Sequence, residues 1–234
     1  FDIGYNNGVS GQTSSRPVTG IGAAAATFTI SDGATYNYGT KATGSSTDKT
    51  FTVTNSGGVN ATSVSVTALA APFSFKGGTY PGTGGDCGAT LAAAATCTMV
   101  VTYAPTGTGA HSDTISVTFN DGVTASQTST RALAGTGAAP AAITISDGAT
   151  YNYGTIANGG SADKTFTINN TGGVPAASLS GAGLAAPFSF KGGSYPGSGG
   201  TCASSLAASG SCTVVVTFAP TASGVQNDAI DITY

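Results

Sequence analysis

Thr29-Ile-Ser-Asp-Gly-Ala-Thr-Tyr-Asn-Tyr-Gly-Thr40 occurs twice in the chain, the second time unchanged as Thr144–Thr155. The offset between the copies is 115 residues (144 − 29). It holds without a gap between Thr27–Phe119 and Ala142–Tyr234, where 58 of the 93 aligned pairs are identical. The repeat is far longer than a solenoid unit and about the size of an all-β sandwich domain, roughly 100 residues. The sequence therefore predicts an array of similar modules.

Each module has the pattern of short β-strands. Apolar residues alternate with Thr, Ser and Asn, and turn residues separate the alternating runs. In the first module we expect strands over residues 27–31, 35–38, 47–55, 61–68, 72–76, 96–104, 112–119 and 123–133. Because side chains alternate between the two faces of a strand, the alternation also predicts the core. The predicted core residues are Phe51, Val53, Met99, Val101, Ile115 and Val117, and in the second module Phe166, Ile168, Val214, Val216 and Ile230.

A hairpin closes the first module. Asn120-Asp-Gly122 lies between two alternating runs, and Asn and Gly tolerate the positive φ angles that tight turns require. Asn6-Asn-Gly8 repeats this turn near the N-terminus. Two further matches follow it: Arg16 aligns with Arg131, and Gly20-Ile-Gly22 aligns with Gly135-Thr-Gly137. Residues 1–22 therefore resemble the closing hairpin of a preceding module.

The phase of the repeat predicts three parts. Residues 1–22 are a closing hairpin of a preceding repeat or a donor strand, residues 23–137 are domain 1, and residues 138–234 are domain 2. Tyr234 aligns with Phe119, so domain 2 lacks its last strand in cis.

Two accounts of these ends stay open. In the first, the chain is cut from a longer array whose neighbouring repeats supply the strands covalently. Residues 1–5 repeat the strand that ends at Tyr234, and this overlap favours the first account. In the second, a donor strand of one subunit pairs with the C-terminal module of the next, a contact that would propagate a filament. The candidate donor residues are Val9, Gln12, Ser14, Arg16 and Val18.

The composition excludes several classes of partner. Only 7% of the residues are charged, against roughly 25% in ordinary soluble domains. The net charge is −3, without a basic stripe, which makes nucleic acid a poor partner. No apolar run approaches the ~20 residues of a membrane span. There is no signal peptide, so we expect a mature or excised segment rather than a cytoplasmic protein.

The four cysteines follow the repeat, since Cys87 and Cys97 recur as Cys202 and Cys212. Of the pairings that four cysteines allow, only Cys87–Cys97 with Cys202–Cys212 joins residues of the same module. A metal site is the alternative, but nine residues between two cysteines is not a zinc spacing, and no His or further Cys lies near. We therefore expect two disulfides, no metal and no cofactor. Disulfides persist in oxidising compartments, which indicates an extracellular location.

A longer motif contains these cysteines. The stretch Cys87-x3-Leu91-x5-Cys97-Thr-x-Val-Val-Thr-Tyr-Ala-Pro105-x3-Gly109 has a counterpart from Cys202 to Gly224. Together with Asn170-Thr-Gly-Gly173 and Leu133-Ala-Gly-Thr-Gly137, it resembles the immunoglobulin-like repeats of the ASPM-SPD-2-hydin group, which are common in bacterial surface proteins of the choice-of-anchor D kind. The resemblance implies an all-β fold of tandem immunoglobulin-like β-sandwich domains with seven to eight strands each. It also implies a secreted or cell-surface bacterial setting, but no reaction, because fold alone does not fix function.

Few side chains suggest chemistry. His111 is the only histidine, and its counterpart is Gln226, so a role in catalysis is disfavoured. Lys49 and Asp113 share the faces of the apolar residues in their strands and recur in the second module, which suggests a half-buried ion pair in each: Lys49 with Asp113, and Lys164 with Asp228. A Lys–Asp isopeptide bond usually needs a third, protonated carboxylate, and the chain has no Glu to supply it. A lysine that reaches to solvent at the strand end is the stronger interpretation.

Other candidates also have a structural interpretation. Asp32 and Asp147, each in Ser-Asp-Gly, suggest calcium, but a calcium site needs about six oxygens, and such residues more often form turns. Tyr36, Tyr38, Tyr80 and their copies suit stacking on sugars, yet packing in the core or at an edge is favoured. Asn60-Ala-Thr62 and Asn169-Asn-Thr171 fit the short pattern for N-glycosylation.

We therefore expect a structural, non-enzymatic repeat protein of a cell-surface or extracellular fibre, stalk or filament, whose main partner is itself. The alternative is an adhesin, a binding module that recognises a glycan or a protein on another surface. An enzyme is disfavoured, because the chain has no Glu and no paired acid and base.

Overall fold

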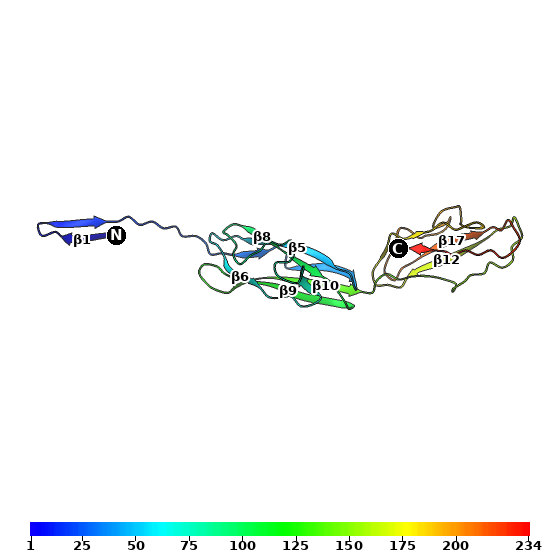
Figure 1. Ribbon diagram of the computed structural model, residues 1–234, viewed down its shortest axis with the longest axis horizontal. Helices are drawn as coiled ribbons and strands as arrows, with labels where there is room; N and C mark the ends of the chain where they lie inside the picture. Colours follow the sequence, from blue (N-terminus) through cyan, green and yellow to red (C-terminus); the bar gives the residue numbers. More distant parts are fainter.

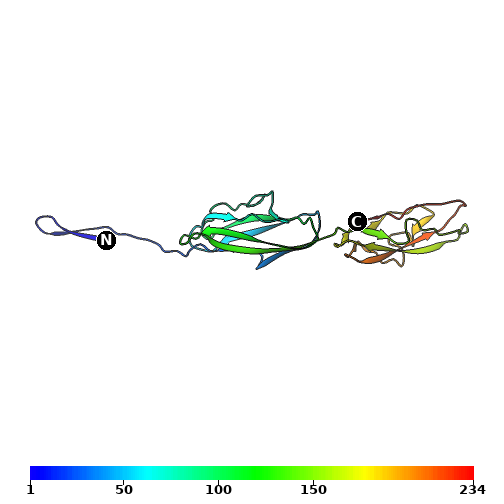
Figure 2. The same ribbon diagram turned by 90° about the horizontal axis from the view of Figure 1, so that it is seen from below.

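The computed structural model describes all 234 residues as β-strands and loops. Figure 1 shows two β-sandwiches one after the other along one long axis, preceded by a hairpin that stands apart from both. Figure 2 gives the same order from below, so this is not an effect of projection. A membrane-crossing helix is absent. The expected all-β fold of tandem sandwiches is confirmed.

The first sandwich consists of two four-stranded sheets. One sheet has the order β3 (Phe28–Ile30), β5 (Thr47–Asn55), β8 (Thr96–Tyr103), β7 (Phe73–Phe75). The other has the order β4 (Thr35–Ala42), β10 (Gln127–Ala138), β9 (Gly109–Asn120), β6 (Thr62–Val66). β10 is antiparallel to β9 and parallel to β4, so it has neighbours on both sides.

The closing hairpin of the first sandwich forms as the sequence predicts. The Asn120 side chain accepts a hydrogen bond from the N–H of Gly122, and β9 and β10 pair over their full lengths. β10 extends to residue 138, beyond the expected end at 133. The apolar alternation does not predict residues 134–138, because two inward positions, Gly135 and Gly137, have no apolar side chain. Tyr103 packs against Gly135, and the backbone of Gly107 lies beside Gly137.

The second sandwich repeats only one of the two sheets in full. That sheet has the order β11 (Ile143–Ile145), β12 (Ala162–Asn170), β17 (Ser211–Phe218), β15 (Phe188–Phe190). The other sheet is reduced to two short pairs, β13 (Ala176–Ala177) with β16 (Ser205–Leu206) and β14 (Ser180–Gly181) with β18 (Ile232–Thr233). Residues 150–157, which match β4, form no strand. The N-terminal hairpin, β1 (Asp2–Asn6) and β2 (Gly11–Ser15), is exposed along its whole length.

Each sandwich has its own core between its sheets, with 19 buried residues in the first and 10 in the second. All the predicted core residues except one are buried. The exception is Ile230, which is only half-buried, whereas its counterpart Ile115 is fully buried. The expectation for Ile230 is wrong. Alternation predicts which face of a strand a side chain lies on, but burial also depends on the neighbouring strands. Ile115 lies beside β10, and Ile230 has no such neighbour.

A buried asparagine in each sandwich ties several loops together. The side-chain oxygen of Asn55 accepts hydrogen bonds from the N–H groups of Thr27 and Gly57. Its amide nitrogen donates to the carbonyls of Val59, Leu91 and Ala92 at 2.9 to 3.2 Å. Asn170 makes the same five contacts in the second sandwich. Buried backbone groups that would otherwise lack partners are thereby satisfied.

The burial of Val101 gives a test of the strand faces. Replacing Val101 by Asp should lower the free energy of unfolding of the first sandwich by roughly 3 kcal/mol or more, because an unpaired charge would be buried. Thr50→Asp is the control, since Thr50 is exposed on the neighbouring β5. Chemical denaturation measures both. A Val101→Asp variant as stable as the control would show that the faces are reversed.

Candidate functional site

The second sandwich has an open position in its fragmented sheet. In the first sandwich β10 fills the place between β4 and β9. The matching segments of the second sandwich are residues 150–157 and 224–231, and they line the two sides of one space with no strand between them. We refer to this space as the open groove.

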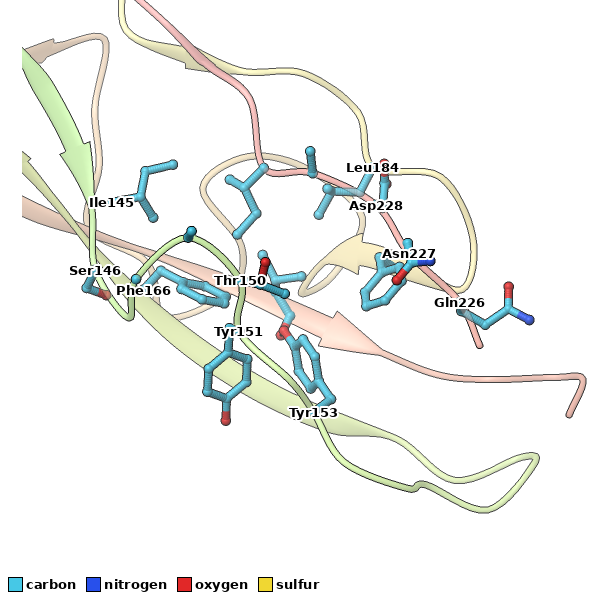
Figure 3. A pocket seen from close by; sticks show the side chains of 16 residues that line it. Ile145, Ser146, Thr150, Tyr151, Tyr153, Phe166, Leu184, Gln226, Asn227 and Asp228 are labelled. Carbon is cyan, nitrogen blue, oxygen red and sulfur yellow. The ribbon is translucent and has the colours of Figure 1, made fainter. Parts of the chain in front are cut away.

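The open groove consists of two adjoining hollows, with volumes of about 280 and 640 Å³. Figure 3 shows Thr150, Tyr151 and Tyr153 on one of the segments that line it and Gln226, Asn227 and Asp228 on another. Side chains of the complete sheet also line the smaller hollow, among them Ile145, Phe166 and Val216. The smaller hollow therefore has a largely apolar lining, the larger one has a mixed lining, and both are bordered by segments without a strand partner.

The side chains around the groove are more exposed to solvent than the matching side chains of the first sandwich. Tyr234 is 55% exposed, whereas its counterpart Phe119 is 5% exposed. Tyr153 is half-buried; its hydroxyl donates to the Val216 carbonyl at 3.0 Å, and burial raises its pKa to about 12. The counterpart of Tyr153, Tyr38, is fully buried and makes the same bond to Val101. The groove walls therefore correspond to core positions of the first sandwich and are more exposed than those are.

β10 shows what the position demands of an occupant. Leu133 points into the core and is 1% exposed, and the Arg131 guanidinium donates to the carbonyl of Ile30. A Cβ at Gly135 would lie 2.7 Å from the Tyr103 ring, and one at Gly137 would lie 2.1 Å from the carbonyl oxygen of Gly107. The strand therefore has an inward pattern of Arg, aliphatic residue, Gly and Gly at every second position.

The lysines pair differently from the expectation. Lys49 binds Asp32, not Asp113, at 2.7 Å, and Lys164 binds Asp147, not Asp228, at 2.7 Å. The lysine side chains also lie over the rings of Tyr36 and Tyr151. The faces are as predicted, but each lysine finds a nearer carboxylate in the turn after the neighbouring strand.

The two aspartates of the expected pairs have another role. Asp113 and Asp228 accept hydrogen bonds from the backbone N–H groups of Ala70 and Ala185, at 2.7 and 2.6 Å. They fix the loop that precedes β7 or β15. A Lys–Asp isopeptide bond between the residues first considered has no geometric basis.

His111 serves the core of the first sandwich. Its Nδ1 lies 2.9 Å from the hydroxyl of Tyr103, a fully buried side chain. In the second sandwich Phe218 replaces Tyr103 and Gln226 replaces His111. The hydroxyl and its partner change together, which is typical of a structural pair, because a buried hydroxyl needs a hydrogen-bond partner.

The calcium and sugar candidates also occupy structural positions. Asp32 has a φ of 73° in the turn after β3, and the hydrogen bond from Lys49 lowers the pKa of its carboxyl group. No group of three or more His, Cys, Asp or Glu side chains is placed to hold a metal ion. Tyr38 lies in the core, and Tyr80 packs edge-on against Phe75. Tyr38 and Tyr80 therefore offer no exposed platform for a sugar, whereas Tyr151, the copy of Tyr36, is 40% exposed.

Both predicted disulfides are present. Cys87–Cys97 and Cys202–Cys212 each close a loop with a sequence separation of 10 residues. The N–H of Cys87 also donates to the carbonyl of Thr98 in β8. Each disulfide therefore fastens a loop to a central strand of the four-stranded sheet, and Cys87, Cys202 and Cys212 are buried among the core residues.

One family model matches the first sandwich. The HYDIN/CFA65/VesB-like, Ig-like domain model matches residues 26–136, which are just under half of the chain and end two residues before β10 does. The first sandwich is therefore similar to the Ig-like domains of this family. The resemblance expected from the sequence is thereby confirmed, and the second Ig-like sandwich repeats the first in sequence. No curated protein matches the chain.

Several solved structures are similar to the Ig-like chain. The VesB protease of Vibrio cholerae is 20% identical with a TM-score of 0.37, over 47% of this chain and 31% of that chain. The PapD-like domain 7 of human CEP192 is 16% identical with a TM-score of 0.37, over 58% of this chain and 99% of that one. The match thus spans about a third of VesB. At these TM-scores the similarities carry no argument about activity or partners.

Removal of one disulfide tests its structural role. Replacing Cys87 and Cys97 together by Ala should lower the free energy of unfolding of the first Ig-like sandwich by about 3 kcal/mol, the typical effect of a short disulfide loop. Chemical denaturation measures it, and the matched Cys202 and Cys212 double variant should leave the first sandwich unchanged. Peptide mapping without reductant should find only links within a sandwich. Free thiols, or a link between the sandwiches, would contradict both the pairing and an oxidising compartment.

Proposed function

We propose that the chain is a structural, non-enzymatic repeat of an extracellular fibre or filament on a bacterial surface, and that its copies assemble head to tail. The observation that carries this proposal is the succession of two Ig-like sandwiches along one axis, each with its own core and its own disulfide. Modules of this kind form an extended, stiff structure and carry out no reaction.

The use of the charged side chains supports a structural role. All four ion pairs in the structure are two pairs repeated: Lys49–Asp32 as Lys164–Asp147, and Lys76–Asp48 as Lys191–Asp163. The first kind joins a strand to the turn after its neighbour, and the second reaches across the central strand β8 or β17 to the end of β7 or β15. Charges that recur in the same structural place in both sandwiches serve the module, because a reaction or a specific ligand would need only one site.

The disulfides support a location outside the cytoplasm. Both link residues of one sandwich and leave no free cysteine. Disulfides of this kind persist in secreted and surface proteins and are rare where thiols are kept reduced. An adhesin would need an exposed recognition surface in addition, and of the tyrosines that first suggested one, only Tyr151 is exposed.

Labelling of the cells that produce the chain tests this proposal. Immunogold electron microscopy with an antibody against the folded sandwiches should place the label along extended structures outside the cell envelope. The control is an antibody against a cytoplasmic protein of the same cells. Label confined to the cytoplasm, or to scattered points without extended structures, would contradict an extracellular fibre.

A further inference from the structure

Two strands from opposite ends of the first sandwich's sequence lie side by side and run in the same direction. β4 pairs with β10 in parallel, from Thr35 beside Ala132 to Ala42 beside Ala138. We propose that this pair is a mechanical clamp, the contact that resists unfolding when the chain is stretched along its length. The inference rests on the proposed function in that a fibre bears tension, and it concerns the first sandwich and its connection to the second.

The strand directions determine how tension would load this pair. β3 and β4 follow each other with only the turn at residues 31–34 between them, and they lie in different sheets. The chain enters the sandwich at β3 and leaves it after β10, and Figure 1 shows these two points at opposite ends of the sandwich. A pull on the chain therefore draws β3 and β4 in one direction and β10 in the other, along the strands.

This loading makes the hydrogen bonds between β4 and β10 act together. Backbone hydrogen bonds in a sheet run between strands and not along them, so sliding β4 past β10 strains all of them at once. A pull that separates the two strands from the same end would instead break the bonds one after another. The pair should therefore resist tension along the chain far better than it resists peeling.

Side chains of β10 also hold the strand that precedes β4. The hydroxyl of Ser129 donates to the carbonyl of Phe28 at 3.1 Å, and the buried guanidinium of Arg131 donates to the carbonyl of Ile30. Phe28 and Ile30 lie in β3, which belongs to the opposite sheet. These bonds connect the first strand of the sandwich with the last one, so β3 cannot move along its axis without breaking them.

β4 is fixed to the opposite sheet in the same manner. The hydroxyl of Tyr38, a fully buried side chain, donates to the carbonyl of Val101 in β8 at 2.9 Å. The Tyr38 ring also packs against the rings of Phe73 and Tyr103. A hydrogen bond in the interior is stronger than one in water. Sliding of β4 would therefore break this bond together with those to β10.

The end of β10 connects to the second sandwich without a flexible linker. The carbonyl of Ala138 accepts a hydrogen bond from the N–H of Thr43 at 2.8 Å, within the first sandwich. The carbonyl of the next residue, Ala139, accepts one from the N–H of Gly173 at 2.9 Å, within the second. A Cβ built at Gly173 would lie 3.0 Å from the Cβ of Ala138. Tension on the second sandwich therefore reaches β10 directly.

Stretching single molecules of the full chain in two directions tests the clamp. Handles attached through unnatural side chains at the exposed positions Ile21 and Ala139 load the first sandwich along the chain. Handles at the exposed positions Thr35 and Thr130 peel β4 from β10 at their shared end. The second arrangement should unfold the sandwich at about half the force or less, because the unfolding rate governs forced unfolding and peeling breaks few bonds at a time. Equal forces in the two directions overturn the proposal.

Two matched substitutions test the contribution of β4. With handles at Ile21 and Ala139, Tyr38→Phe should unfold about fivefold faster at a given force, since it removes one buried hydrogen bond. Tyr80→Phe is the control, because the Tyr80 hydroxyl is buried without a hydrogen-bond partner, and it should unfold like the wild type. A Tyr38→Phe chain that unfolds no faster than the control also overturns the proposal. A chain found on extended surface structures that unfolds at the same force in both directions would retain the proposed function and overturn the clamp.

Discussion

The structure depends on the requirement that a strand inside a sheet has hydrogen-bonding neighbours on both sides. β10 meets this requirement in the first sandwich, since it pairs with β9 over residues 127–137 and with β4 over residues 132–138. In the second sandwich residues 150–157 form no strand, and the counterpart of β9 keeps only the short strand β18. Backbone groups left without partners are a known hazard of open sheet edges. The smaller core, the exposed Tyr234 and the open groove all lie at the place that β10 fills in the first sandwich.

The complete sheet of the second sandwich explains how the module keeps its fold without that strand. β12 and β17 pair over eight positions, as β5 and β8 do. The buried Asn170 and the disulfide Cys202–Cys212 fix the loops around the same sheet. One half of the module is thus a complete four-stranded sheet, and the other half consists of two short strand pairs.

The repeat and the strand alternation predicted most of the fold. Parity placed Phe51 and Val101 in the core, and the repeat paired the cysteines correctly. Ile230 was misplaced because burial depends on a neighbouring strand, which a pattern within one strand does not report. The prediction of a Lys49–Asp113 ion pair was wrong for a related reason. Strand parity gives the face on which a side chain lies, but not its distance from a partner. Asp32, in the turn after β3, is the carboxylate that Lys49 binds. The role of Asn55 was missed, although its recurrence as Asn170 before Gly-Gly was a usable signal.

Hydrogen exchange at residues 150–157 tests the central claim most directly, since these residues match β4 but lack its partner. In the monomeric chain their amides should exchange rapidly, while those of Thr35–Ala42 and of β12 should be protected, because strand pairing slows exchange. Protection of residues 150–157 equal to that of β4 would contradict the account that pairing with β10 is what orders this segment in the first sandwich.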